Sequence, residues 1–167
     1  MLGHIKAVHL NVGKRNTAQW SLLCDEDVAS SDVLTIVEPY VYEDPCTGEP
    51  KTLGDGRWQL FTPNERQPGE ARFAFRAAVC VSKRHTAQQV PVPSSDVVAV
   101  TIETSEATLL VVVAYDVKLS GRQTASEEQL QDKLRIIRDV YSAAQSKRPH
   151  RETELLLCAN FNRHYVL

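Results

Sequence analysis

The chain has 167 residues, a length that suits one domain, and 43% of its residues are hydrophobic while 24% are charged. These fractions are close to the globular average and exclude disordered, collagen-like and coiled-coil architectures. The net charge of −2 comes from 19 Lys and Arg against 21 Asp and Glu. A non-specific polyanion binder is therefore not expected, because such proteins release counterions with a cationic surface. A local phosphate-binding site is still compatible with this charge balance.

The first 38 residues alternate strand, helix and strand. Residues 4–11 form a β-prone run, and residues 33–37 form an apolar run that Pro39 ends. Between them, Asn16 begins a predicted helix with Gln19 in capping-box spacing. The buried face of this helix is expected to consist of Trp20, Leu23, Cys24 and Val28. The pattern predicts a βαβ unit with parallel strands.

The middle of the chain is predicted to contain strands and loops. Residues 43–56 are rich in Pro, Gly and acidic side chains and are typical of a loop. Residues 57–62 and 73–81 are strand-like. Residues 97–104 and 108–115 flank a short connection of hairpin length. The second of these runs is almost continuously apolar, which indicates a strand buried on both faces.

A long amphipathic helix and a last strand complete the predicted elements. Ser126 and Gln129 form a second capping box, and Pro149 ends the helix. Residues 154–159 form a strand that continues into the polar segment 160–164. The apolar stripe of the helix is expected to be Leu130, Leu134, Ile137, Tyr141 and Ala144. We therefore predict one α/β domain over residues 1–167.

No targeting signal or membrane segment is evident in the sequence. No run reaches the roughly 18 apolar residues of a membrane span, and residues 1–13 lack the apolar core of a signal peptide. No Walker loop and no G-x-G-x-x-G motif occur, so no nucleotide cofactor is expected. We expect an intracellular protein, in cytoplasm or nucleus, with no membrane partner. Its cysteines are expected to be buried free thiols: Cys24, Cys46, Cys80 and Cys158.

Four predicted strands end in polar residues that could form one site. They end at Asn11, Glu38, Tyr115 and the Asn160–x–Asn162 segment. Ligands of open α/β sheets collect beyond the carboxyl ends of strands. One carboxylate with carboxamides and a phenol suits a hard divalent cation and phosphate oxygens. Each residue alone also fits a structural role, as a strand end, a turn or a core aromatic, so the inference depends on their combination.

The order and wording of these segments resemble the endonuclease/exonuclease/phosphatase superfamily. The matching motifs are LNVG near the N-terminus, I-x-E-P-Y after the second strand, a strand ending in Tyr, and x-F-N-R-H after the last strand. The similarity is greatest to endonuclease domains of non-LTR, LINE-type retrotransposons and covers essentially all of the chain. It implies a two-sheet α/β sandwich and Mg²⁺-dependent (or Mn²⁺-dependent) cleavage of phosphodiesters, with DNA as the substrate.

The resemblance also implies roles for single residues. Glu38 matches the metal-binding carboxylate, and Asn11 matches the amide beside that metal. Tyr115 matches the phenol that contacts the scissile phosphate, and Asn162 matches the asparagine that holds a phosphate oxygen. Asn160 stands where the family's G-D-F-N motif has the aspartate that positions and deprotonates the attacking water. Here the motif is A-N-F-N.

Two departures from the family pattern predict impaired hydrolysis. The carboxamide of Asn160 cannot accept a proton, and general-base catalysis is worth about 10²–10⁴ in rate. The chain also ends at Leu167, before the family's later Asp and its histidine–acid pair, so we expect a sandwich incomplete at its C-terminus. Missing strands would leave an open sheet edge, which predicts self-association.

Three interpretations stay open at this point. The first is a retrotransposon-type, Mg²⁺-dependent endonuclease-like domain with weakened catalysis. The second is a catalytically inactive binding or interaction protein, oligomeric, on the same fold. The third is a generic α/β binding module whose motif matches are accidental. Convergence of Asn11, Glu38, Tyr115 and Asn162 in one pocket would separate the first two from the third.

Overall fold

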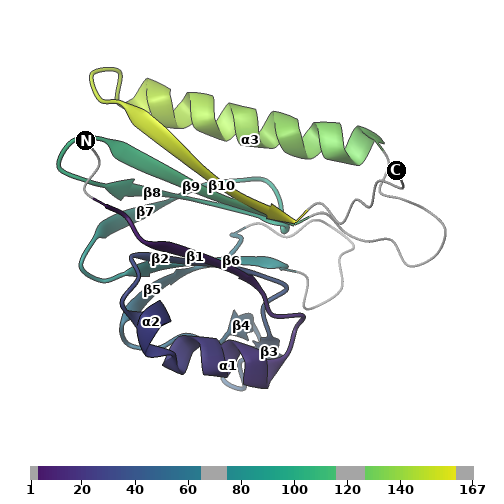
Figure 1. Cartoon of the computed structure of the whole chain (residues 1–167). Helices are drawn as coiled ribbons and strands as arrows, with labels where there is room; N and C mark the ends of the chain where they lie inside the picture. Colours follow the sequence, from purple (N-terminus) through teal and green to yellow (C-terminus); the bar gives the residue numbers. More distant parts are fainter. Residues whose placement is uncertain (1–3, 65–74, 116–126, 161–167) are drawn as a thin grey trace, which may run out of the picture.

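Two four-stranded sheets lie face to face in the computed structural model, which describes residues 4–64, 75–115 and 127–160 (Figure 1). The first sheet has the order β1-β2-β6-β5, with β1 at Ala7–Asn11, β2 at Val33–Val37, β6 at Ala77–Ser82 and β5 at Trp58–Phe61. The second has the order β10-β9-β8-β7, with β10 at Thr153–Asn160, β9 at Thr108–Tyr115, β8 at Val97–Glu103 and β7 at Thr86–Val90. A separate ribbon pairs β3 (Val41–Glu43) with β4 (Pro50–Thr52).

Helices cover the outer faces of both sheets. The helices α1 (Asn16–Cys24) and α2 (Glu26–Ala29) pack on the first sheet, and α3 (Glu127–Lys147) packs on the second (Figure 1). The result is the α/β sandwich that the sequence predicts. Among the described residues, no helix is long and apolar enough to cross a membrane.

The core between the sheets consists of apolar, mostly β-branched side chains at alternate strand positions. All eight residues of β9 are buried, which confirms the prediction of a strand covered on both faces. The inner faces of the central strands contribute Val33, Val37, Val79, Val81, Val98, Val100, Ile102, Val111 and Val113.

Strand directions bring the polar strand ends together. The pairs β1–β2 and β9–β10 are parallel, as the βαβ pattern predicts for the first of them, and helices form both crossovers. The strands β6 and β8 run antiparallel to their neighbours β2 and β9. One edge of the sandwich therefore holds the carboxyl ends of β1, β2, β9 and β10 and the amino ends of β6 and β8.

The first helix differs from its prediction. Arg15, not Asn16, precedes the helix, and its side chain makes no capping hydrogen bond. The helix also ends earlier, because Asp25 caps α2 through a 3.0 Å hydrogen bond from Val28 N–H. Trp20, at 52% exposed, and Cys24 face away from the core, so their predicted burial is wrong.

Gln19 explains why the helix is rotated in this way. Its side chain is fully buried and is not a capping group. The Nε2 atom donates to Thr52 Oγ1 at 2.9 Å and to Leu53 O at 3.0 Å, while Oε1 accepts from Tyr40 N–H at 2.7 Å. These bonds satisfy a buried amide by tying α1 to the β3–β4 ribbon. A helical pattern of apolar residues cannot predict such a contact.

Other local predictions also need correction. The predicted loop at 43–56 contains β4, and β7 was not predicted because its sequence TAQQV is polar. On α3, Leu134 is 40% exposed while Val140 is buried, so the stripe is shifted. The second capping box lies outside the described residues. Of the cysteines, Cys80 is buried and burial raises its pKa to about 12, whereas Cys46 joins Cys24 as exposed.

Candidate active site

The candidate site is built around Glu38, the residue that follows β2. Its Oε2 atom accepts a hydrogen bond from Asn11 Nδ2 at 3.0 Å, and its Oε1 atom accepts one from the Tyr115 hydroxyl at 2.9 Å. Asn11 ends β1 in the same sheet, whereas Tyr115 ends β9 in the other. The structure therefore brings together three of the sequence-predicted site residues across both sheets.

The backbone at this edge is unusual. Glu38 has φ of 50°, and Gly13 and Lys14 in the facing loop have φ of 56° and 59°. Left-handed backbone costs a non-glycine residue about 1–2 kcal/mol. Glu38 is held in it by two main-chain bonds, from its own N–H to Arg76 O at 2.8 Å and from Lys14 N–H to its carbonyl at 2.7 Å. Strain that surrounding contacts enforce is typical of functional sites.

The Asn11 side chain has a fixed orientation. Its Oδ1 atom accepts from Gly13 N–H at 2.8 Å, and this local turn leaves Nδ2 directed at Glu38. The turn residue Gly13 takes the positive φ that glycine tolerates at no steric cost. The Asn11 side chain thus stabilises the turn through Oδ1 and contacts the carboxylate through Nδ2. The structural and the functional interpretations of this residue are therefore compatible.

Tyr115 is held by main-chain contacts at the end of β9. It is 5% exposed, its N–H donates to Asp96 O at 3.0 Å, and Lys133 Nζ on α3 donates to its carbonyl at 2.8 Å. Its ring belongs to the core between the sheets, and only the hydroxyl reaches the Glu38 carboxylate. The core role of Tyr115 and its predicted role at the site, which the sequence left as alternatives, are therefore compatible.

The two asparagines of the last motif are placed differently. Asn160 pairs with Tyr115 in the β10–β9 register. Because Leu156 and Cys158 face the core between the sheets, strand alternation puts Asn160 on that same inner face, half-buried. Asn162 lies outside the described residues, so its convergence with the others stays a prediction.

The donor set fits a single hard cation. Each oxygen of Glu38 accepts one hydrogen bond and has a second lone pair, and its charge has no cationic partner among the described residues. Mg²⁺ is commonly bound by one or two carboxylates, with water and substrate phosphate completing its shell. No cluster of three or more His, Cys, Asp or Glu occurs within the described ranges. A metal ion held by Glu38 would therefore depend on water and substrate phosphate for its other ligands.

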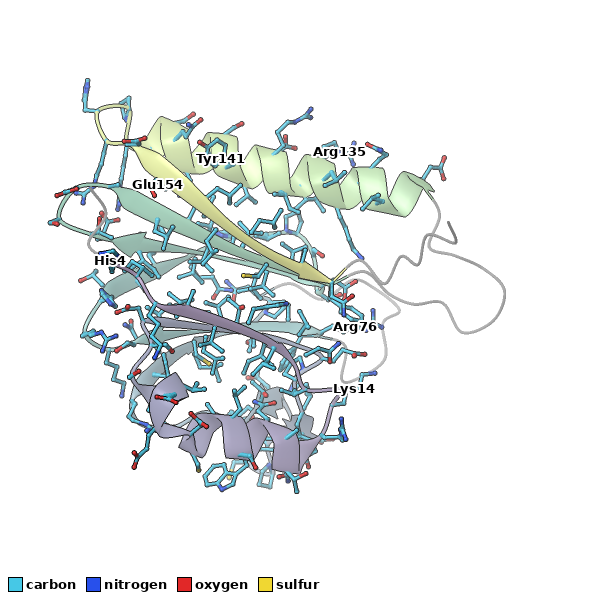
Figure 2. All side chains as sticks on the ribbon, in the orientation of Figure 1. His4, Lys14, Arg76, Arg135, Tyr141 and Glu154 are labelled. Atoms are coloured by element: carbon cyan, nitrogen blue, oxygen red, sulfur yellow. The ribbon has the colours of Figure 1, made fainter. Side chains whose placement is uncertain are left out.

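Sequence analysis missed three charged residues at this edge. Arg76 precedes β6 and Asp96 precedes β8, and their side chains form an ion pair with Nη1 to Oδ1 at 3.3 Å. Lys133 Nζ lies 3.5 Å from Asp96 Oδ2. Figure 2 shows Arg76 and Lys14 at the same end of the sheets as the tip of β10. One charged residue beside a strand is a weak signal, and only the strand register reveals the cluster.

No protein-family model matches the sequence, and no curated protein is similar to it at a significant level. Solved structures do match. The endonuclease domain of TRAS1, a telomere-specific non-LTR retrotransposon, has a TM-score of 0.64 at 17% identity over 97% of this chain. A magnesium-bound beta toxin variant from Staphylococcus aureus gives 0.57 at 10% identity over 99%. D. rerio TDP2 with a single-strand DNA product gives 0.56 at 11% over 96%.

These similarities confirm the fold that the sequence motifs predicted. The chain has the two-sheet α/β fold of these solved structures, and this is the fold that the resemblance to the endonuclease/exonuclease/phosphatase superfamily implies. It spans 61% of the TRAS1 domain, 67% of the beta toxin and 62% of the TDP2 chain.

Proposed function

We propose that this chain is a retrotransposon-type endonuclease-like domain that hydrolyses DNA phosphodiesters with Mg²⁺ or Mn²⁺, at a rate lowered by Asn160. The observation that carries the proposal is the Glu38 carboxylate, which Asn11 and Tyr115 orient from the ends of two further strands. A carboxylate with neutral donors and no cationic partner within the described structure keeps its charge available to a metal ion.

Each residue has a chemical task in this proposal. Glu38 holds the metal, which when bound polarises a phosphoryl oxygen as a Lewis acid. Asn11 fixes one carboxylate oxygen through Nδ2. Tyr115 hydrogen-bonds Glu38 in the free protein, and its hydroxyl can turn to donate to a phosphate oxygen once substrate binds. Asn162 would hold a second phosphate oxygen.

Exposed cations around the site favour a polyanionic substrate. Lys14 and Arg15 follow Asn11 and are exposed, and Arg15 lines a shallow groove between β1 and α1 that begins at Asn11. Arg76 lies beside Glu38, whose N–H donates to the Arg76 carbonyl, but the half-buried Arg76 side chain pairs with Asp96. The local pair of Lys14 and Arg15 can position phosphates although the chain as a whole is slightly acidic. A structural neighbour holds single-strand DNA, which is consistent with this substrate class.

The test is conversion of supercoiled plasmid to nicked circle by the purified protein with Mg²⁺ or Mn²⁺. We expect slow nicking that requires the metal and disappears in Glu38→Ala. The matched control is Glu106→Gln, which removes an exposed carboxylate from the turn before β9, at the far end of that strand from Tyr115. It should nick like the original protein. Equal nicking by Glu38→Ala and the control would refute the site.

Absence of nicking by a folded protein would favour the second candidate, a non-catalytic binding protein on the same fold. The carboxamide at Asn160 is the observation behind it. Isothermal titration with Mn²⁺ and with a short single-stranded DNA then separates the candidates, because a binding protein retains DNA affinity without turnover.

We also propose that the chain self-associates through its open edge. In the described part of the chain, β1 and β10 are terminal strands of their sheets. Leu10, Leu155 and Leu157 on these strands are 40%, 43% and 41% exposed. Unpaired strands with apolar side chains readily pair with another chain. Light scattering over a hundredfold concentration range should show mass increasing with concentration, and Leu157→Lys should suppress it. A constant monomer mass would contradict the proposal.

A further inference from the structure

A partly buried charged cluster connects the two sheets at the candidate site. It consists of Arg76, Asp96 and Lys133, which we call the bracket. Their side chains are 28%, 11% and 12% exposed. Asp96 is its centre, with Arg76 on one carboxylate oxygen and Lys133 on the other.

Strand register places each member of the bracket beside a site residue. The pair Val37–Ala77 in the β2–β6 register puts Arg76 next to Glu38, and Glu38 N–H donates to Arg76 O at 2.8 Å. The pair Ala114–Val97 in the β9–β8 register puts Asp96 next to Tyr115, whose N–H donates to Asp96 O at 3.0 Å. The Arg76–Asp96 ion pair thus connects the backbone that carries Glu38 to the backbone that carries Tyr115.

Lys133 adds the outer helix to this connection. Its Nζ atom donates to Tyr115 O at 2.8 Å and lies 3.5 Å from Asp96 Oδ2. One ammonium group therefore holds both the end of β9 and the start of β8. Because Asp96 is buried, its charge requires these partners. Removing one partner of a buried ion pair strongly destabilises the folded protein, since the other charge is left uncompensated.

We infer that the bracket of Arg76, Asp96 and Lys133 positions the Tyr115 hydroxyl against the Glu38 carboxylate, so that the site depends on residues that do not touch the substrate. This inference rests on the proposed function for its effect on rate, but the placement itself can be tested without catalysis. The Glu38–Tyr115 bond spans two sheets, and a shift of about 1 Å between reacting groups can cost a factor of about 10² in rate.

The first test is a double-mutant cycle in nicking rate. Asp96→Asn keeps the shape of the side chain and removes its charge. We expect a 10- to 100-fold lower kcat with KM changed less than about threefold, and under about twofold further loss of kcat in a Tyr115→Phe background. Equal factors in both backgrounds would mean a general structural role and would overturn the inference.

The second test needs no activity. The coupling between Tyr115→Phe and Glu38→Ala, measured by urea unfolding, should be about tenfold in the unfolding equilibrium constant, since a hydrogen bond to a charged group contributes at least that. In the Asp96→Asn background it should fall below about twofold. Unchanged coupling overturns the bracket even if the protein nicks DNA. Lost coupling supports it even if the protein does not, so the two proposals fail separately.

Matched variants separate charge from folding. Asp132→Asn removes a carboxylate one position before Lys133 on α3, where Asp132 forms an exposed pair with Arg135. It should leave both the coupling and the kcat unchanged. Arg76→Lys should retain most of the coupling that Arg76→Met loses, because an ammonium can still pair with Asp96. Greater coupling in Arg76→Met than in Arg76→Lys, or loss of coupling in Asp132→Asn, would contradict the role inferred for the bracket.

Discussion

The two ends of β2 carry carboxylates with opposite surroundings. Asp32 precedes the strand and is surrounded by donors, with Arg84 Nε and Nη2 at 2.8 and 2.6 Å and His85 Nε2 at 2.5 Å from Oδ1. Lys6 N–H donates to Oδ2 at 2.8 Å. Glu38 follows the strand, and within the described part of the chain its side chain receives two donors, both neutral, from Asn11 and Tyr115.

The backbone differs between these ends as well. Glu38 is held at positive φ, whereas Asp32 is not among the described residues with positive φ. A carboxylate saturated by cationic donors stabilises the fold, and one held in strained backbone with its charge uncompensated is suited to bind a ligand. Two acids six residues apart, one at each end of the same strand, thus separate into a structural and a candidate functional role.

The largest effect should come from Glu38→Gln. We expect metal-dependent nicking to fall about 10³-fold, or ~4 kcal/mol of barrier, because the amide cannot hold the cation. The free energy of unfolding should change by less than about 1 kcal/mol, since the amide oxygen can still accept from Asn11 and the amide NH2 group can donate to the Tyr115 hydroxyl oxygen. Nicking kinetics and urea unfolding on one preparation measure both quantities. A loss of unfolding free energy as large as the increase in the reaction barrier would mean that Glu38, like Asp32, mainly stabilises the fold.

The next effect should be a gain, from Asn160→Asp. The new carboxylate lies beside Tyr115 in the strand register and can act as the general base that Asn160 cannot. We expect nicking to rise about 10²-fold, or ~2.7 kcal/mol. Asn16→Asp at the start of α1 makes the same charge change elsewhere and should have no effect on rate. An unchanged rate in Asn160→Asp would exclude a base at this position.

Asp32→Asn should have the opposite profile to Glu38→Gln. It should lower the free energy of unfolding by about 2 kcal/mol, because charge-assisted bonds are lost and Arg84 and His85 keep unmatched donors. Nicking by the folded protein should stay within threefold. The control Asp139→Asn removes an exposed pair with Arg138 and should cost under about 0.5 kcal/mol. Equal losses in the two variants would show that the contacts of Asp32 stabilise the fold no more than an exposed ion pair does.

The stability that Asp32 contributes should also depend on pH. Burial opposes ionisation of Asp32, but hydrogen bonds from His85, the Lys6 N–H and Arg84 outweigh it, so its pKa lies below the usual value. A lowered folded-state pKa gives stability that is complete above about pH 4, the unfolded pKa, and is lost as pH falls through the folded value. Urea unfolding from pH 7 to 2.5 should therefore show a gap between the original protein and Asp32→Asn that closes in acid. A constant gap would assign the stability to packing.

The sequence predicts the architecture well where one pattern determines a segment. Apolar runs with clear ends predict β2, β8, β9 and β10 within one or two residues, and the βαβ rule predicts that β1 and β2 are parallel. That rule also explains why Asn11 and Glu38 lie together, since both follow neighbouring parallel strands. The metal and catalytic roles of these residues remain predictions.

The remaining features depend on contacts between distant segments. The burial of Gln19 requires the β3–β4 ribbon, whose sequence indicated a loop. The bracket requires the registers of β6 and β8, because a slip of one residue would turn Arg76 or Asp96 to the other face of its sheet. The strain at Glu38 has no signal in the sequence either, since glycine is the residue that favours positive φ.

That strain gives the smallest effect and a direct test of the backbone. Glu38→Gly and Glu38→Ala both remove the carboxylate, and at φ of 50° the glycine variant should be more stable by about 1 kcal/mol. At Glu43 on β3, which is not among the described residues with positive φ, the same pair should show alanine more stable by about 0.5–1 kcal/mol. Urea unfolding of the four variants measures both differences. Alanine as the more stable residue at both positions would mean that Glu38 is not strained, and the contrast between the two ends of β2 would then depend on charge alone.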